Sequence, residues 1–351
     1  MFKRINGIQH IGVAVTDMDE SLKFYRKFFG MNIPFFDAVA EAPLMDIYTR
    51  NETITKRASM IVNLQGGAAM EVIRPTSFEP VKASFEIQPG DLGIFATQIG
   101  TADVEAMHTF CIKNDPPFTS ELSTRPDGQK TFFIKDLDGN HFQYVYSDHQ
   151  YVDHGYPSIG ATSCSIGVKN IEKARELYSD VLGYDKVIYD STDSKDFAST
   201  WSDYGSVRRV LLTQTAPPGG GFGKMLGENF IELVEATDRE PKTIFQDRIW
   251  ADTGFVHLGF DAKGMKALGE DLKMKGFGFT CDSNDALDMG TTKVHCTYIE
   301  DPDHTWLELI EVFKVPIIEK WGIFLNVEKR DPLKPLPDFM LKALRFSRIN
   351  D

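Results

Sequence analysis

The sequence predicts an α+β protein made of four copies of one unit, in which a strand is followed by a helix and then by three more strands. A strand pattern with a histidine and, two residues later, a glycine occurs near both ends of the chain, in Ile8–Val13 and in Phe255–Phe260. A helical pattern that ends in glycine also occurs twice, in Tyr25–Gly30 and in Tyr178–Gly183. Repeats of this kind indicate that one small unit recurs along the chain.

A turn motif indicates that the chain has two similar halves. Asp136–Asn140 in the first half corresponds to Asp301–Thr305 in the second, and each precedes a strand pattern. The chain has 351 residues, which is more than one hydrophobic core usually supports. We therefore expect a tandem duplication with two units in each half. The predicted division is 1–150, 156–313 and a C-terminal extension, 314–351.

The first unit shows the expected order of elements. A strand at Ile8–Val15 precedes a helix that Asp17 caps, with Glu20 in the capping-box position. Gly30 supplies the left-handed residue that ends this helix. Strand-like runs follow at Leu44–Tyr48, Ser59–Leu64 and Ala69–Arg74, and an insertion is expected within residues 31–58.

The other three units follow the same pattern. Each opens with a strand, continues with a helix and closes with a strand: Leu92–Thr97, Ala102–Lys113 and Phe142–Tyr146 in the second unit, Thr162–Val168, a helix capped by Asn170 and Phe230–Val234 in the third, and Phe255–Phe260, Met265–Lys275 and Trp306–Ile310 in the fourth.

The composition argues against several classes of protein. A net charge of −13 argues against a general nucleic-acid binder. The four cysteines form no C-x-x-C pair, so a zinc knuckle is not indicated. No apolar run is long enough to span a bilayer, and the N-terminus lacks a signal-peptide pattern. We expect a cytoplasmic protein with a small-molecule substrate and without nucleic-acid or membrane partners, either a monomer or a homodimer.

Two glutamates lie on predicted closing strands. Glu71 lies within Ala69–Ile73, and Glu308 lies within Trp306–Ile310. A carboxylate that points into a core without a partner is very costly, and Lys and Arg are scarce in these strands. Carboxylates and imidazoles together are ligands of divalent transition metals. The two glutamates and the two strand histidines are therefore candidates for one metal site.

The order of elements resembles that of the vicinal oxygen chelate superfamily, which includes glyoxalase I, methylmalonyl-CoA epimerase, fosfomycin-resistance proteins and extradiol dioxygenases. The resemblance covers about residues 5–313. It implies that the four βαβββ units form two domains with cupped mixed sheets. It also implies that metal ligands come from the opening and closing strands of the units.

Carried onto this sequence, the resemblance gives eight candidate positions. In the order of the units they are His10 and Glu71, Gly93 and Gln143, Ser163 and Glu232, and His257 and Glu308. Only the first and fourth units hold a His/Glu pair. Pairing of consecutive units would leave two incomplete sites, whereas pairing of the first unit with the fourth gives one complete site. We favour the crossed pairing, with one divalent ion (Zn, Ni, Mn or Fe(II)) bound by His10, Glu71, His257 and Glu308.

The resemblance leaves three functions open. The favoured one is a glyoxalase- or epimerase-like lyase or isomerase, in which four protein ligands hold a metal that stabilises an enediolate, with Glu71 or Glu308 as the base. The alternative is an Fe(II)-dependent extradiol-type ring-cleaving dioxygenase, which uses two histidines and one carboxylate. Tyr298 is a further candidate catalytic residue, because its spacing from Glu308 is similar to that of a second-sphere tyrosine in the ring-cleaving members. The third is a metal-free small-molecule-binding protein. Glu71 favours the first, because the resemblance implies no ligand at that position in the dioxygenases.

Two further segments stand outside the repeat. Pro218–Met225 is rich in glycine but does not match the phosphate-loop pattern, and we expect a flexible loop that could cover the cup. In the extension, a short helix is expected at Asp338–Phe346. The aromatic residues expected to anchor the extension on the domains are Trp321, Phe324 and Phe339, with a dimer contact as the alternative.

Overall fold

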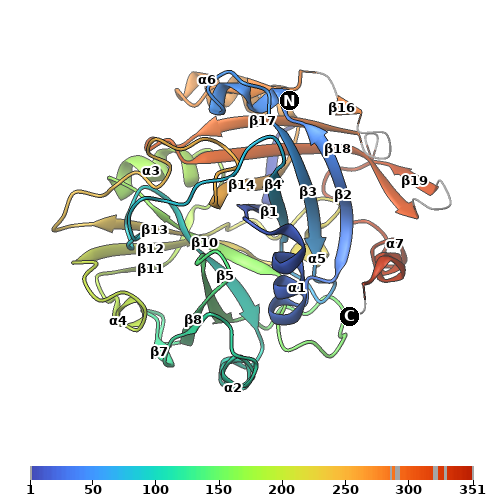
Figure 1. Ribbon diagram of the computed structural model, residues 1–351. Helices are drawn as coiled ribbons and strands as arrows, with labels where there is room; N and C mark the ends of the chain where they lie inside the picture. Colours follow the sequence, from blue (N-terminus) through green and yellow to red (C-terminus); the bar gives the residue numbers. More distant parts are fainter. Residues whose placement is uncertain (1, 285–286, 289–292, 319–322, 328–329, 350–351) are drawn as a thin grey trace.

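Two large mixed β-sheets with helices packed on them form the body of the protein (Figure 1). The structure is a computed structural model and describes residues 2–284, 287–288, 293–318, 323–327 and 330–349. The expected α+β fold with two curled sheets is confirmed. The helices are α1 (Met18–Phe29), α2 (Val104–Asn114), α3 (Ile171–Tyr178), α4 (Lys195–Ala198), α5 (Gly223–Leu226), α6 (Met265–Met274) and α7 (Asp338–Ala343), with the 3-10 helices η1 (Pro43–Tyr48) and η3 (Leu344–Ser347).

The first sheet is built from the two ends of the chain. Its strands are β1 (Arg4–Ala14), β2 (Ile33–Glu41), β3 (Thr55–Val62), β4 (Ala69–Pro75), β14 (Gly254–Lys263), β15 (Cys281–Asp282), β16 (Leu287–Asp288), β17 (Lys293–Glu300), β18 (Trp306–Ile318) and β19 (Ile323–Asn326). The main path runs β15-β17-β18-β14-β1-β4-β3-β2. In Figure 1 this sheet carries the blue and orange of the two chain ends.

The second sheet is built from the middle of the chain. Its strands are β5 (Gly93–Thr101), β6 (Phe118–Thr119), β7 (Ser123–Thr124), β8 (Lys130–Lys135), β9 (His141–Tyr146), β10 (Ala161–Gly167), β11 (Lys186–Ser191), β12 (Val207–Thr213) and β13 (Phe230–Ala236). The main path runs β11-β12-β13-β10-β5-β9-β8-β6.

The two sheets do not correspond to the two halves of the chain. At the centre of the first sheet, β1 of the first unit pairs antiparallel with β14 of the fourth. In the second sheet, β5 of the second unit lies beside β10 of the third. Each sheet therefore combines one unit from each half.

Two buried tyrosine–aspartate pairs join units that belong to different sheets. The Tyr25 hydroxyl on α1 donates to Asp136 Oδ2 at 2.7 Å, and the Tyr178 hydroxyl on α3 donates to Asp301 Oδ2 at 2.9 Å. All four side chains are buried. The helix motif and the turn motif that repeat in the sequence therefore contact each other. One contact joins a helix on the first sheet to a turn of the second sheet, and the other joins a helix on the second sheet to a turn of the first.

The stretch between the first helix and β3 differs from its prediction. The strand expected at Leu44–Tyr48 is the 3-10 helix η1, which begins at Pro43. The second strand of the unit is instead β2, within the stretch that we expected to be an insertion. This strand lies at the sheet edge and is exposed along most of its length, so the sequence carries no burial pattern that marks it.

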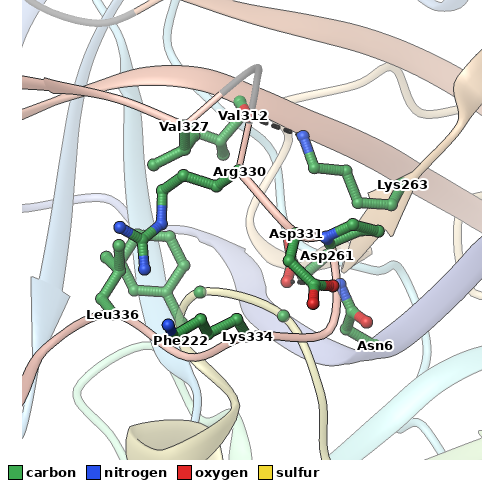
Figure 2. Close-up of a pocket in the computed structure, with 13 residues that line it drawn as sticks. Asn6, Phe222, Asp261, Lys263, Val312, Val327, Arg330, Asp331, Lys334 and Leu336 are labelled. Carbon is green, nitrogen blue, oxygen red and sulfur yellow. Dashed lines mark hydrogen bonds between the residues drawn. The ribbon is translucent and has the colours of Figure 1, made fainter.

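The glycine-rich loop lies against the C-terminal extension. The Leu336 amide donates to the Gly221 carbonyl at 2.9 Å, and the two segments line a pocket with Asn6 and Asp261 (Figure 2). The pocket has a volume of about 30 Å³, which suits a single water molecule rather than a substrate. The glycine-rich loop therefore packs against the C-terminal extension.

The extension differs in part from its prediction. The expected helix is present as α7 followed by η3, and Leu336 and Leu341 are buried anchors. Phe339 is 69% exposed, so it is not the anchor that we expected. Trp321 and the side chain of Phe324 lie outside what the structure describes. In the described part of the chain, no helix has both the length and the apolar character needed to cross a bilayer.

Candidate metal centre

The register of β1 against β14 explains why each histidine is followed by a glycine. His10 stands opposite Gly259, and His257 stands opposite Gly12. A Cβ atom at Gly12 would lie 2.3 Å from the His257 ring, and one at Gly259 would lie 2.2 Å from the His10 ring. Each glycine therefore makes room for the histidine of the other unit, and the pattern works only because the two units pair.

The closing strands bring the two glutamates to the same place. β4 runs parallel to β1 with Glu71 beside Gly12, and β18 runs parallel to β14 with Glu308 beside Gly259. The same register thus occurs on both sides of the central β1–β14 pair. It places the four predicted side chains at the centre of the sheet.

The four donor atoms converge. His10 Nε2 lies 2.9 Å from His257 Nε2, 3.1 Å from Glu308 Oε2 and 3.8 Å from Glu71 Oε2. His257 Nε2 lies 3.3 Å from Glu71 Oε2 and 3.5 Å from Glu308 Oε2. Metal–ligand bonds of about 2.1 Å hold neighbouring donors about 3.0–3.4 Å apart, so these separations fit one ion at the centre of the group.

Burial and charge act against each other at these side chains. His10 and His257 are 1% and 0% exposed, and Glu71 and Glu308 are 8% and 9% exposed. Burial disfavours the charged form of His10, but the Glu308 and Glu71 carboxylates together outweigh it and raise the pKa of His10. Burial also disfavours ionised Glu71, but Lys56 and the two histidines hold the pKa of Glu71 below its ordinary value. Two buried carboxylates with one lysine, which is paired with Glu71, call for a further cation.

Neighbouring groups orient the two imidazole rings. His10 Nδ1 lies 3.2 Å from Gln9 Oε1, and His257 Nδ1 lies 3.3 Å from the Tyr298 hydroxyl. If each Nδ1–H donates to its oxygen partner, each Nε2 keeps its lone pair for a metal. Tyr298, which we predicted to be catalytic, thus contacts one of the donors directly.

The second sheet has different residues at the same positions. Its register pairs Ser165 with Glu232 and Gln98 with Gln143, as Gly12 pairs with Glu71. The equivalent of His10 in the second unit is therefore Ala96, and our assignment of Gly93 was wrong. We had counted positions from the start of β5, where Gly93 lies. The register of β5 is instead set by its pairing with β9, which the local sequence does not reveal.

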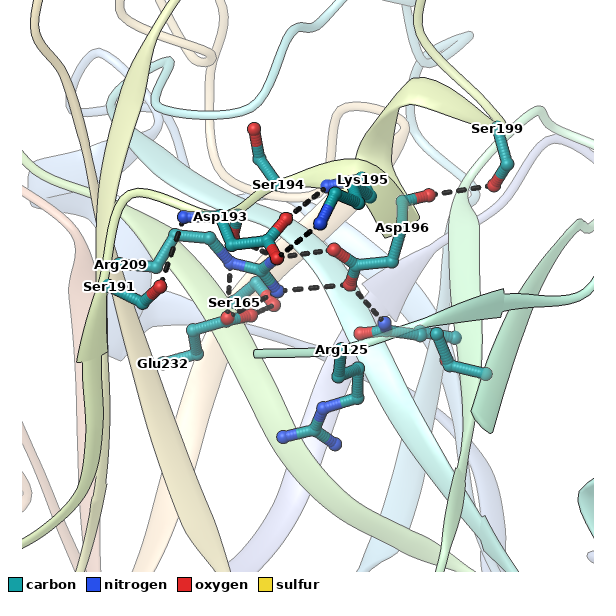
Figure 3. Close-up of polar contacts among 12 residues, drawn as sticks. Arg125, Ser165, Ser191, Asp193, Ser194, Lys195, Asp196, Ser199, Arg209 and Glu232 are labelled. Carbon is teal, nitrogen blue, oxygen red and sulfur yellow. Dashed lines mark hydrogen bonds and ion pairs between the residues drawn. The ribbon is translucent and has the colours of Figure 1, made fainter. Parts of the chain in front are cut away.

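An arginine supplies the cation in the second sheet (Figure 3). Arg209 is fully buried, and its Nε donates to Glu232 Oε1 at 2.8 Å while its Nη2 donates to Asp196 Oδ2 at 3.1 Å. We did not predict this residue from the sequence, because a lone arginine on a strand carries no motif. Among the described residues, one group of three or more His, Cys, Asp or Glu side chains could hold a metal ion. It consists of His10, Glu71, His257 and Glu308.

Comparison with known proteins agrees with this fold. Residues 7–144 match the family model described as Glyoxalase/Bleomycin resistance protein/Dioxygenase superfamily. A putative dioxygenase from Bacillus subtilis subsp. subtilis str. 168 has a similar structure, with 13% identity, a TM-score of 0.57 and coverage of 88% of this chain and 86% of that one. Glyoxalase I from Zea mays has 15% identity and a TM-score of 0.55, with coverage of 88% and 92%.

The comparisons support the superfamily and the fold together. No curated protein matches the chain. The matched segment spans the first two units, which lie in different sheets, and the structural likeness extends over both sheets. Residues 7–144 thus match the Glyoxalase/Bleomycin resistance protein/Dioxygenase superfamily, and the chain as a whole shares the fold of glyoxalase I from Zea mays.

Proposed function

We propose that the protein is a metal-dependent lyase or isomerase of the glyoxalase type, which moves a proton next to a carbonyl of a small oxygen-rich substrate. The observation that supports this best is the fourth donor. Glu71 Oε2 lies 3.3 Å from His257 Nε2, within a group whose ligand atoms all lie within 4.8 Å of one another. A divalent metal bound there would withdraw electron density from the substrate oxygens and so stabilise an enediolate.

The surroundings of the two glutamates favour Glu308 as the base. The Lys56 ammonium lies 3.4 Å from Glu71 Oε1, and an adjacent cation makes a carboxylate a weaker base. In the described part of the chain, no lysine or arginine forms an ion pair with Glu308. Glu308 would therefore take the substrate proton and return it at the neighbouring carbon, while Glu71 stays in place.

Tyr298 acts on this centre through His257. Its hydroxyl is buried, and burial together with Glu308 and Glu71 raises the pKa of Tyr298, so the phenol stays protonated. The 3.3 Å contact with His257 Nδ1 gives Tyr298 a role in holding that ring.

An Fe(II) extradiol-type dioxygenase is the second candidate. His10, His257 and Glu308 together make a set of two histidines and one carboxylate, which leaves positions on iron for substrate and O₂. Glu71 occupies the space of one such position, which favours the lyase or isomerase. A metal-free binding protein is disfavoured, because it would leave two buried carboxylates with one lysine.

Oxygen consumption separates the two enzymes. The protein is loaded anaerobically with Fe(II), or with Ni, Zn or Mn, and offered catechols in air. The lyase or isomerase predicts tight binding of Ni, Zn or Mn and no O₂ uptake with any metal. Fe(II)-dependent O₂ uptake on a catechol would favour the dioxygenase instead. In that case Glu71→Gln would keep the uptake, whereas Glu308→Gln would abolish it.

A further inference from the structure

The charge of the metal centre is unbalanced once a divalent ion is present. Glu71 and Glu308 are the buried carboxylates of the group, and Lys56 is the cation paired with one of them. Without a metal these groups leave one excess negative charge, and a divalent ion turns this into one excess positive charge. A buried excess positive charge favours a ligand with one negative charge.

Trp250 contributes an unused hydrogen-bond donor next to the same centre. Its side chain is 2% exposed, and its ring is parallel to that of His257, with centroids 6.2 Å apart. Its indole Nε1–H is buried and has no acceptor among the described residues. The indole nitrogen can only donate, and an unmade buried hydrogen bond is costly, so an acceptor from a ligand would stabilise it.

Lys56 lies beside both Trp250 and the candidate ligands. Its ammonium is 5.4 Å from the centre of the Trp250 ring and makes one long contact, 3.4 Å, with Glu71 Oε1. A lysine has three donors, so this contact leaves capacity for another acceptor. The side chain is 17% exposed, so solvent reaches part of it.

Comparison with the second sheet indicates that Lys56 belongs to the metal centre and not to the repeat. Met60 stands opposite Glu71, and Leu211 stands opposite Glu232. The residue that corresponds to Lys56 in the second sheet is therefore Val207, which is buried. The sheet that has its own arginine as a cation has no lysine at this position.

We propose that the substrate is a small monoanion, a hydroxy or oxo carboxylic acid whose carboxylate is bound by Lys56 Nζ and Trp250 Nε1 and whose reacting oxygen is on the adjacent carbon. The two oxygens of a carboxylate match one cationic donor and one neutral donor. The proposal rests on the proposed function, because the excess positive charge exists only with a divalent metal bound. Hydroxy acids and oxo acids are the classes of substrate that it names.

The test compares lactate with lactamide, which has the same vicinal oxygens without the negative charge. Binding of each to the metal-loaded protein is measured by titration calorimetry, after the metal content has been determined. We expect lactate to bind roughly tenfold or more tightly than lactamide, as a charge-assisted hydrogen bond requires. In Lys56→Met this preference should be lost, and in Lys56→Arg it should be retained. Trp250→Phe, which keeps an aromatic ring but lacks the N–H, should weaken lactate binding several-fold.

The control is Lys82→Met, since Lys82 is an exposed lysine paired with Asp138, and it should leave lactate binding unchanged. Metal-loaded wild-type protein that binds both probes equally would overturn the inference and leave the proposed function standing. So would a Lys56→Met variant that holds its metal and keeps the preference for lactate. A wild-type protein that holds no metal would overturn both.

Discussion

His10 and His257 lie in a space that two glycines provide, and this gives the repeated pattern a physical meaning. The ring of each histidine occupies the place where a side chain at the opposite glycine would stand. The sequence shows the four residues plainly, but only the register between β1 and β14 shows that each glycine serves the histidine of the other unit.

Gly12→Ala tests this arrangement. The new methyl group would lie 2.3 Å from the His257 ring, so the ring must move and its Nε2 must leave the group of donors. We expect metal affinity to fall about 10–100-fold, as for other changes that misorient a ligand, with the fold retained. Competition with a chelator measures it. Gly278→Ala is the matched control, because a Cβ there meets no atom within 4 Å; equal losses in both variants would contradict the account.

Asp261 gives the protein a pH dependence that is separate from the metal centre. Burial raises the pKa of Asp261 to about 6, against a contribution from the Asn6 amide that lowers it. The folded state therefore binds this proton more tightly than the unfolded state, whose Asp has a pKa of about 3.9. The contribution to stability is fully present below pH 4 and is lost as the pH rises through 6, by up to about 3 kcal/mol.

Asp261→Asn should remove this slope while keeping an oxygen near Asn6. The free energy of unfolding in urea, measured at pH 4 and pH 8, should fall less in the variant than in the wild-type protein. Identical pH dependence in the two proteins would show that Asp261 is not buried as a proton-binding group.

At the scale of elements, the two sheets show two ways to balance buried carboxylates. In the first sheet the group of donors needs an added cation, whereas in the second sheet Arg209 lies between Glu232 and Asp196. The same register of opening and closing strands serves both, so the difference lies in a few side chains. The second sheet therefore has no need of a metal at the equivalent position.

We expect the Arg209→Met variant to unfold at a lower urea concentration than the wild-type protein. The change removes the arginine that pairs directly with buried Glu232 and Asp196 and leaves Arg125 as a more distant cation, which costs up to about 3–5 kcal/mol. The adjacent Arg208 is partly exposed and also paired, so Arg208→Met should cost under about 1 kcal/mol. Urea unfolding of both variants measures the difference, and similar losses would contradict the role of Arg209.

The sequence predicts the elements with strong periodicity and misses those that depend on pairing. The opening strands, α1 and the four metal-site residues follow from local patterns. The edge strand β2 was missed because it is largely exposed, and the Gly93 assignment was wrong because strand register is not local. Lys56 and Trp250 were missed because they are far apart in sequence and become neighbours only when β3 and the segment before β14 pack together.

At the scale of the whole molecule, one chain end completes the site of the other. His10 and Glu71 come from the first unit, and His257 and Glu308 come from the fourth, so all four donors belong to one chain. The second and third units, which separate them in sequence, form the other sheet. The protein therefore needs no partner subunit to complete this centre.

Dividing the chain tests this dependence of one half on the other. Residues 1–155 and residues 156–351, produced separately, should each bind a divalent metal at least about 100-fold more weakly than the whole chain, because each holds two of the four donors. Co-expression of the two fragments should restore tight binding. A monomeric 1–155 fragment that binds one metal as tightly as the whole chain would contradict the shared centre.

The metal content of the purified protein decides whether the two chain ends share a metal centre. We expect one divalent ion per chain in the wild-type protein by elemental analysis, and none in a His10→Ala/His257→Ala double variant whose circular dichroism is unchanged. A wild-type protein without metal after incubation with Zn, Ni, Mn and Fe(II), or a double variant with the same metal content, would contradict it.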